Sequence, residues 1–237
     1  MALIWLLFSF GLVFGSFYNV LIYRIPKGKS IVFPRSQCPD CGHTLTAWEL
    51  IPVFSYLIQR GKCRSCGEKI SWEYPVVELT TAVGFAVCAY TAGSLNQLAV
   101  RLVFFSLLLI ASVIDFKHKI LPNVITIPGI ILGVLAAVIG WTIPLTESLI
   151  GIFVGGGILF VIAAITRGMG MGDVKFLAMI GAFIGPLPTL GTLFLGSLFG
   201  SVSGIIYLAI TKQGRKTPIP FGPFLALGAV VSALYFF

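Results

Sequence analysis

Charged residues are scarce in this sequence of 237 residues, where they make up 10% of the total. Soluble domains carry about 25%. Apolar residues account for 57%, and the mean hydropathy is +1.02. Several runs approach the ~20 apolar residues that cross the hydrocarbon core of a bilayer. The usual soluble fold classes are therefore excluded, and the sequence predicts an all-α polytopic membrane protein.

Other common features are absent as well. The N-terminus has no basic n-region and no convincing small-residue cleavage site, so we do not expect a cleavable signal peptide. The sequence contains no internal repeat and no low-complexity tail. The net charge is +8, but the basic residues cluster beside apolar runs. Because no fold is predicted that could present them to a polyanion, nucleic acid is not an expected partner.

About eight apolar segments are predicted to cross the membrane. They cover residues 2–22, 76–92, 98–115, 123–140, 148–166, 174–187, 189–211 and 220–237. A polar module, residues 23–75, separates the first segment from the second and holds four of the five cysteines. We therefore expect three parts: a first transmembrane helix at 1–22, this module, and a seven-helix membrane core at 76–237.

Lysine and arginine predict the orientation of the chain. With alternating crossings, one side of the membrane collects 15 of the 16 basic residues, and the other side has only Arg101. The basic side consists of residues 23–75, 116–122, 167–175 and 212–219. Loops rich in lysine and arginine face the cytoplasm. Both termini are therefore expected outside, with the polar module in the cytoplasm.

Two cysteine pairs predict a metal site in this module. Cys38-Pro-Asp-Cys41 and Cys63-Arg-Ser-Cys66 are separated by a 21-residue spacer. A two-residue gap lets both thiolates of one turn reach a single ion, and four thiolates in a tetrahedron suit structural Zn²⁺. Two disulfides are the alternative, which a reducing cytoplasm disfavours. His43 would be a surplus ligand and is interpreted as solvated or as a neighbour of the ligands. Cys88, inside the second span, is expected to act as a small hydrophobe.

The chain has three aspartates, Asp40, Asp115 and Asp173. Asp40 lies inside the first cysteine pair and is expected to be solvated. Asp173 begins the sixth predicted span, and Asp115 ends the third at the same membrane face. An acid at the mouth of a membrane segment is a candidate functional residue. For Asp173 alone, an N-cap of the following helix is the alternative.

Capping cannot explain Asp115, because a carboxylate is disfavoured at the C-terminal end of a helix. Its partner is either a local cation (Lys117, His118 or Lys119) or Asp173. Two adjacent carboxylates retain one proton between them, which provides a general acid and a general base around one water. Gly170 and Gly172 would let an extended substrate strand approach. The rival interpretation is a zinc-bearing transporter or scaffold that uses the two aspartates for proton relay.

Several motifs together resemble the bacterial type IV prepilin peptidases, which are intramembrane aspartyl proteases of the GxGD class. Their order along the chain also matches the family. The motifs are Gly170-Met-Gly-Asp173, Asp115 with Leu121-Pro122, Gly15-Ser-Phe-Tyr-Asn-Val20 through Arg24-Ile-Pro26, the two cysteine pairs with Tyr74-Pro-Val-Val-Glu78, and Pro220-Phe-Gly-Pro-Phe-Leu-Ala-Leu-Gly228.

The resemblance implies that the enzyme cleaves a basic leader from type IV prepilins or pseudopilins at the cytoplasmic face of the bacterial inner membrane. It also implies N-methylation of the new N-terminus from S-adenosyl-L-methionine. Because enzyme and leader are both positive, recognition would rest on the apolar stem of the substrate and on acids such as Glu73 or Glu78.

The cofactor site is much less clear from the sequence. Residues 23–75 contain no Gly-rich dinucleotide fingerprint. Candidate cofactor-binding residues are Asn19, Arg24 and Glu78, which are polar positions beside the module. In the alternative interpretation, Glu78 stabilises the first turn of the second span and Asn19 forms a hydrogen bond between helices.

Overall fold

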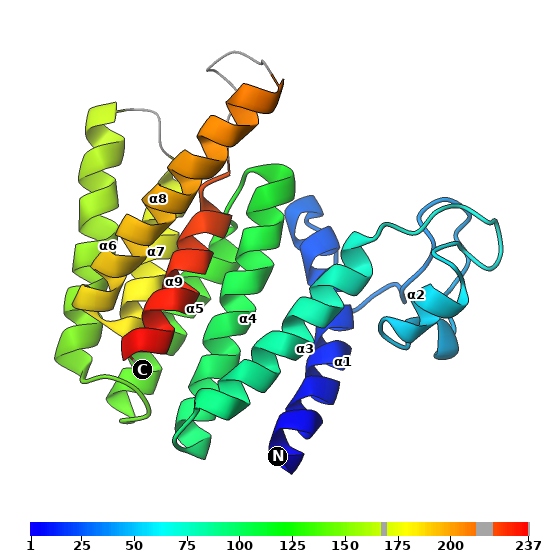
Figure 1. The fold of residues 1–237 in the computed structure, drawn as a ribbon, viewed down its shortest axis with the longest axis horizontal. Coiled ribbons are helices and arrows are strands. Elements are labelled where there is room, and N and C mark those ends of the chain that lie inside the picture. The colour runs from blue at the N-terminus through cyan, green and yellow to red at the C-terminus, as the bar shows by residue number, and fades with distance from the viewer. Residues whose placement is uncertain (167–169, 212–219, 237) are drawn as a thin grey trace. The chain divides into compact units, whose positions relative to one another are not determined.

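The computed structural model describes residues 1–166, 170–211 and 220–236. These residues are helical or irregular, with two isolated β-bridges, Gln37 with Thr44 and Lys62 with Lys69. The chain divides into two compact units, Met1–Gly93 and Ser94–Phe237 (Figure 1). Each unit has its own packed helices.

In the first unit, α1 (Ala2–Arg24) packs along α3 (Glu73–Thr91) (Figure 1). Residues later in α1 face residues earlier in α3, so the two helices are antiparallel. These positions are Gly11 with Ala82, Gly15 with Glu78, and Asn19 with Tyr74. A Cβ added at Gly15 would lie 2.6 Å from the Cα of Glu78. Glycine therefore lets the two backbones approach closely, as is common for helices in lipid.

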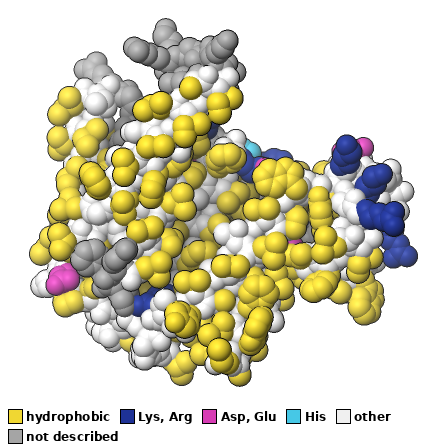
Figure 2. Space-filling model, in the orientation of Figure 1, with side chains coloured by type: hydrophobic (Ala, Val, Ile, Leu, Met, Phe, Trp, Pro, Cys, Tyr) yellow, Lys and Arg dark blue, Asp and Glu magenta, His cyan; other side chains and the backbone are white. Residues whose placement is uncertain are grey.

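The residues between these helices form the predicted polar module. It contains two short 3₁₀ turns, η1 (Ile25–Lys27) and η2 (Trp48–Leu50), and one short helix, α2 (Phe54–Ile58). Figure 2 shows lysine and arginine side chains gathered over the loops around α2, whereas hydrophobic side chains cover most of the visible helical surface. On this face, the basic side chains are therefore concentrated on the module.

The second unit is built around a short buried helix, α7. The unit consists of α4 (Leu95–His118), α5 (Asn123–Val138), α6 (Leu145–Thr166), α7 (Met171–Ile184), α8 (Pro186–Thr211) and α9 (Gly222–Phe236). Helix α7 contacts α5, α6, α8 and α9, and every residue from Phe176 to Ile184 is buried. Gly151 of α6 and Gly181 of α7 bring the two backbones into direct contact. A side chain at either position would collide with the opposite carbonyl group.

The eight predicted spans correspond to α1 and α3–α9, with boundaries shifted by a few residues. By length and composition, four helical stretches in the described residues could cross a membrane: Ala2–Lys27, Leu95–His118, Leu145–Thr166 and Pro186–Tyr207. Two shorter helical stretches, Asn123–Val138 and Gly222–Leu234, are also apolar. The structure therefore confirms a helical membrane protein, but it does not confirm the predicted number of eight crossings.

Helix α7 is shorter than a usual membrane-spanning helix. Its 14 residues rise roughly 21 Å, which is less than the ~30 Å hydrocarbon core. Asp173 and Lys175 also lie in its first turns. Three parts of the predicted layout lie outside the described residues: 167–169 of the loop 167–175, the loop 212–219, and the final residue of the last span.

Candidate active site and metal centre

Asp115 lies in the last turn of α4, which ends at His118 and has Lys119 as its C-cap. The backbone of Lys119 is left-handed (φ 56°), and its N–H donates to the Asp115 carbonyl at 2.8 Å. The Asp115 side chain is 5% exposed. Its Oδ2 accepts a hydrogen bond of 2.9 Å from the backbone N–H of Gly222, the first residue of α9. The carboxylate thus meets the positive end of another helix, which offsets its unfavourable place at the end of its own.

Asp173 lies in the first turn of α7 but does not cap it. The N-cap is Gly170, and the N–H of Asp173 donates to the Gly170 carbonyl at 3.2 Å. The alternative interpretation of Asp173 as an N-cap is therefore wrong. The N-cap is Gly170 rather than Asp173, three residues earlier than that interpretation required, because the backbone of Gly170 is still extended (φ −74°, ψ 143°) and the helix begins at Met171. A carboxylate in the first turn is still favoured by the helix dipole.

The fold brings the two aspartates to the same end of this unit, because Gly172, next to Asp173, packs against Leu121, six positions after Asp115. The unit Ser94–Phe237 contains just three acidic residues, Asp115, Glu147 and Asp173. Glu147 is exposed at the start of α6. Two of the three acids of a largely apolar unit therefore lie together, although their mutual repulsion opposes this.

The two predicted support glycines differ in their surroundings. A Cβ at Gly172 would lie 2.9 Å from the Cβ of Leu121, so glycine lets the start of α7 pack against the Leu121-Pro122 turn. A Cβ at Gly170 would lie 3.7 Å from Oδ2 of Asp173, which is ordinary contact. Lys175 Nζ donates to Asn123 Oδ1 at 2.9 Å and joins α7 to the start of α5. No local pattern in the sequence predicts this bond between side chains 52 positions apart.

The four predicted metal ligands form one cluster. The sulfur atoms of Cys38, Cys41, Cys63 and Cys66 all lie within 4.8 Å of one another. The distances from Cys38 to Cys66 and from Cys41 to Cys63 are 3.9 and 4.0 Å. A tetrahedron with Zn–S bonds of ~2.3 Å has edges of about 3.8 Å. The cysteines are free thiols rather than disulfides, so the cluster matches the donor set and size of a zinc site.

Both cysteine turns have the same backbone geometry. In the first, Cys38 N–H donates to the His43 carbonyl at 2.9 Å and Gly42 N–H to the Cys38 carbonyl at 3.0 Å. In the second, Cys63 N–H donates to the Glu68 carbonyl at 2.8 Å and Gly67 N–H to the Cys63 carbonyl at 2.9 Å. Gly42 and Gly67 are left-handed (φ 73° and 76°). Such turns point backbone N–H groups at sulfur, and those of Cys66 and Ser65 lower the pKa of the Cys63 thiol to about 7.

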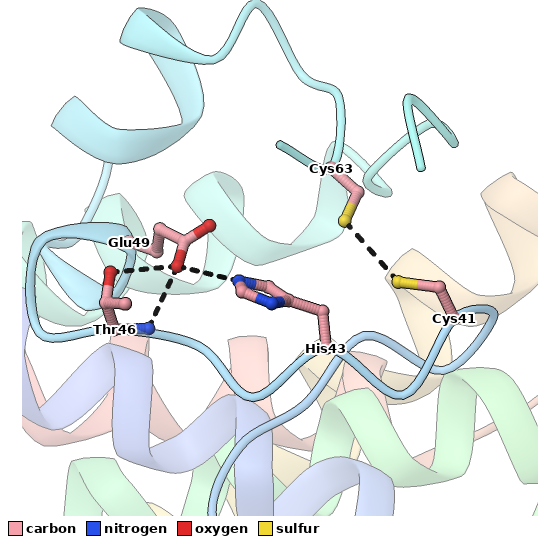
Figure 3. Close-up of polar contacts among 5 residues, drawn as sticks. All are labelled: Cys41, His43, Thr46, Glu49 and Cys63. Atoms are coloured by element: carbon pink, nitrogen blue, oxygen red, sulfur yellow. Dashed lines mark hydrogen bonds and ion pairs between the residues drawn. The ribbon is translucent and has the colours of Figure 1, made fainter. Parts of the chain in front are cut away.

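His43 and Glu49 form a polar network beside the cluster (Figure 3). His43 Nε2 lies 3.2 Å from Glu49 Oε2, and the same oxygen accepts from the backbone N–H and hydroxyl of Thr46 at 2.9 and 2.8 Å. These bonds from Thr46, followed by His43, lower the pKa of Glu49. The interpretation of His43 as a neighbour of the ligands agrees with this geometry. Glu49 was missed, although the Thr-x-x-Glu spacing of a capping box was readable in the sequence.

The three candidate cofactor residues bind backbone in three different segments. Asn19 Nδ2 donates to the Tyr74 carbonyl at 3.1 Å, as the alternative interpretation expected. The two terminal nitrogens of Arg24 donate to the carbonyls of Ser30 and Pro34 at 2.9 and 2.6 Å. Glu78 accepts the N–H of Val53 at 2.7 Å and so binds the module rather than its own first turn.

Two family models match the chain, one in each unit. Residues 9–92 match the Bacterial Peptidase A24 N-terminal domain, and residues 102–205 match the Type IV leader peptidase family. Both matched descriptions are those of peptidases. The second match includes Asp115 and Asp173.

Similar proteins extend this match over almost the whole chain. A prepilin leader peptidase/N-methyltransferase of Bacillus subtilis is 40% identical over 231 residues, which cover 97% of this chain and 93% of that relative. Proteins of the same name from Pseudomonas putida and Pseudomonas aeruginosa are 34% and 36% identical, each over 95% of this chain and 88% of the relative. The chain therefore belongs to the type IV leader peptidase family, as the motifs predicted. No solved structure matches it.

Proposed function

We propose that Asp115 and Asp173 are the catalytic pair with which this enzyme cleaves the leader peptide from prepilins or pseudopilins. The enzyme is a prepilin peptidase with N-methyltransferase activity. The observation that supports the pair is that Gly172, next to Asp173, packs against Leu121 in the turn that follows Asp115, in a unit with just three acids. Family membership disfavours the alternative of a transporter or scaffold that relays protons.

The chemistry of this pair follows from its mutual repulsion. Because both carboxylates do not ionise readily together, one retains a proton. The ionised carboxylate takes a proton from water as the water oxygen attacks the scissile carbonyl carbon. The protonated one donates to the carbonyl oxygen, and the amide bond then breaks as a proton passes to the leaving nitrogen. Of the two support glycines, Gly170 leaves room for an extended substrate strand, whereas Gly172 packs against Leu121.

The experiment that tests this function is cleavage of a purified prepilin by the purified enzyme in lipid or detergent. Mass spectrometry separates three species: the uncleaved prepilin, the cleaved pilin and the cleaved pilin with one methyl group. We expect the enzyme to produce cleaved pilin, and methylated pilin when S-adenosyl-L-methionine is present. A proton-coupled transporter would leave the prepilin intact.

S-adenosyl-L-methionine supplies the methyl group when it is bound, but Asn19, Arg24 and Glu78 do not fit a cradle for it. Each donates or accepts at least one hydrogen bond that holds backbone of its own unit. We therefore derive no methyl-transfer step from them. Glu78 is also buried, whereas Glu73 is partly exposed. Of the two acids considered for binding a basic leader, Glu73 is the more accessible.

The four thiols of the cluster would hold one structural Zn²⁺, with the His43–Glu49 pair beside them. Zinc binds thiolate rather than thiol, and a thiol with a lowered pKa, such as Cys63, gives up its proton more readily. Because all four positions are cysteines, no coordination site is left for water, which suits a structural rather than a catalytic ion.

Replacement of Glu49 by glutamine is expected to weaken zinc binding. In the described part of the chain, Glu49 Oε1 is buried without a hydrogen-bond partner. The amide nitrogen of the introduced glutamine would occupy this position or displace the bonds from Thr46 and His43. A buried unpaired donor costs about 1–3 kcal/mol. Zinc transfer to a competing chelator should therefore be faster than in the wild type.

The matched control for this change is Glu68→Gln, which makes the same substitution in the same module at an exposed side chain. It should leave zinc transfer unchanged. Equal transfer rates for Glu49→Gln and the wild type would show that the His43–Glu49 network does not support the cluster.

The proposed membrane topology is based on the distribution of lysine and arginine between the apolar helices. We place the protein in the inner membrane with eight crossings, with α1 as the first helix (1–22), the module (23–75) in the cytoplasm and a seven-helix core (76–237). Helix α7 is counted as a crossing although it is shorter than the hydrocarbon core, because the surrounding helices enclose its ends in protein rather than lipid. Both termini lie outside and the aspartates lie at the cytoplasmic face. The supporting observation is that 15 of the 16 basic residues fall on one side.

A further inference from the structure

The first turn of α9 has one backbone donor that is not used inside the helix. The N–H groups of Phe224 and Leu225 both donate to the Phe221 carbonyl at 3.1 Å. Pro223 has no N–H. Within residues 222–225 this leaves the N–H of Gly222, which donates to Asp115 Oδ2 at 2.9 Å. The carboxylate of Asp115 therefore acts as the cap of a helix that begins 107 positions further along the chain.

This bond requires the absence of a side chain at position 222. A Cβ on Gly222 would lie 2.8 Å from Asp115 Oδ2 and 3.2 Å from both Cβ and Cγ of Asp115. Real Cβ atoms essentially never approach another atom closer than 3.0 Å. The aspartate side chain is short and is attached to α4, so it has little freedom to move aside. An alanine here would shift the carboxylate, the start of α9, or both.

We propose that Gly222 is a positioning residue for Asp115. Its N–H holds one carboxylate oxygen, and its lack of a side chain leaves the space that this oxygen occupies. The positive end of α9 adds to the attraction. The inference rests on the proposed function, because it assigns to Gly222 the task of holding Asp115 in place for catalysis.

The expected effect is on turnover rather than on substrate binding. Gly222 acts through the carboxylate that activates water, and a displacement of about 1 Å at a reacting group lowers the rate by roughly 10²-fold. The variant Gly222→Ala should therefore lower kcat for prepilin cleavage by about this factor and leave KM unchanged. Methyl transfer to a pilin that has already been cleaved should continue, because this step breaks no amide bond and needs no activated water.

The control on the same helix is Gly228→Ala. A Cβ at Gly228 would lie 2.6 Å from the Thr192 carbonyl oxygen, so this variant disturbs the packing of α9 against α8 without touching Asp115. It should lower the melting temperature while kcat of the folded enzyme stays near that of the wild type. Loss of cleavage and methyl transfer to the same extent in Gly222→Ala would indicate a folding role and overturn the inference.

A second measurement does not depend on whether Gly222→Ala folds. Hydrogen–deuterium exchange at the Gly222 amide should be faster in Asp115→Ala than in the wild type, with Phe224 and Leu225 unchanged. Unchanged protection at Gly222 would overturn the inference. Cleavage by Asp115→Asn would instead overturn the catalytic pair itself, whereas an inactive Asp115→Asn beside a fully active Gly222→Ala would remove only the role of Gly222.

Discussion

Asp115→Asn and Asp173→Asn are each expected to lower the rate of leader cleavage by roughly 10²–10⁴-fold, the usual contribution of a general acid or base. Asparagine has almost the shape of aspartate but cannot take a proton from water. In Asp115→Asn, the side-chain oxygen of the asparagine can still accept the N–H of Gly222, so the fold should persist. The double variant should be little slower than either single variant, because the effects of substituting residues that act as a unit are not additive. The measurement is the rate of mature pilin formation under single-turnover conditions.

The matched control is Glu147→Gln, which neutralises the third acid of the same unit at an exposed position. It should cleave prepilin at the wild-type rate. Methyl transfer to pilin that has already been cleaved provides a check that the asparagine variants are folded. Wild-type cleavage by either asparagine variant would contradict the proposed pair.

Replacement of ligands in the four-cysteine cluster is expected to have a large effect on the zinc content and the protease resistance of the module. We expect one zinc ion per chain in the wild type and none in the double variant Cys38→Ser with Cys66→Ser. Structural zinc contributes an apparent binding free energy of about 10–16 kcal/mol at pH 7 in zinc-finger peptides, much of which serves folding. Zinc content by mass spectrometry and protease cleavage within residues 25–72 are the measurements.

We expect the module to depend on the ion because it has almost no apolar core. Within residues 25–72, Cys38 and Cys63 are the buried hydrophobic residues, whereas Trp48, Phe54 and Ile58 are largely exposed. Without zinc we therefore expect rapid proteolysis of this segment. Cys88→Ser is the control, since Cys88 lies in α3 outside the cluster and its replacement should leave the zinc content unchanged. A zinc-free wild type with the same protease resistance would contradict the prediction.

The helices and the cysteine cluster could be predicted from the sequence because their signals are local. An apolar run predicts a helix from its own residues, and two Cys-x-x-Cys pairs carry their geometry within a few positions. The capping box of Thr46 and Glu49 is equally local, since its Thr-x-x-Glu spacing lies within four residues. The number of membrane crossings, by contrast, cannot be predicted from local sequence signals alone. Helix α7 owes its burial to the helices around it, which its own 14 residues do not reveal.

Asp115 shows how far the sequence argument reaches. Its place at a helix C-terminus predicted that it needs a partner, and the expected partners were nearby cations or Asp173. The hydrogen-bond donor that the structure provides is the backbone N–H of Gly222. A backbone donor has no signature in the residue type, and its partner depends on how α4 and α9 pack. Likewise, the place of Asp173 in α7 depends on where the backbone turns helical, which a residue pattern defines to within one or two positions.

The burial of α7 also has a consequence for the lipid dependence of this enzyme. A mismatch between bilayer thickness and helix length acts on the helices that face the acyl chains, which respond by tilting. Asp173 is carried by a helix too short to span the hydrocarbon core and enclosed by α5, α6, α8 and α9. A change in bilayer thickness is therefore expected to alter the position of this carboxylate through movements of the surrounding helices.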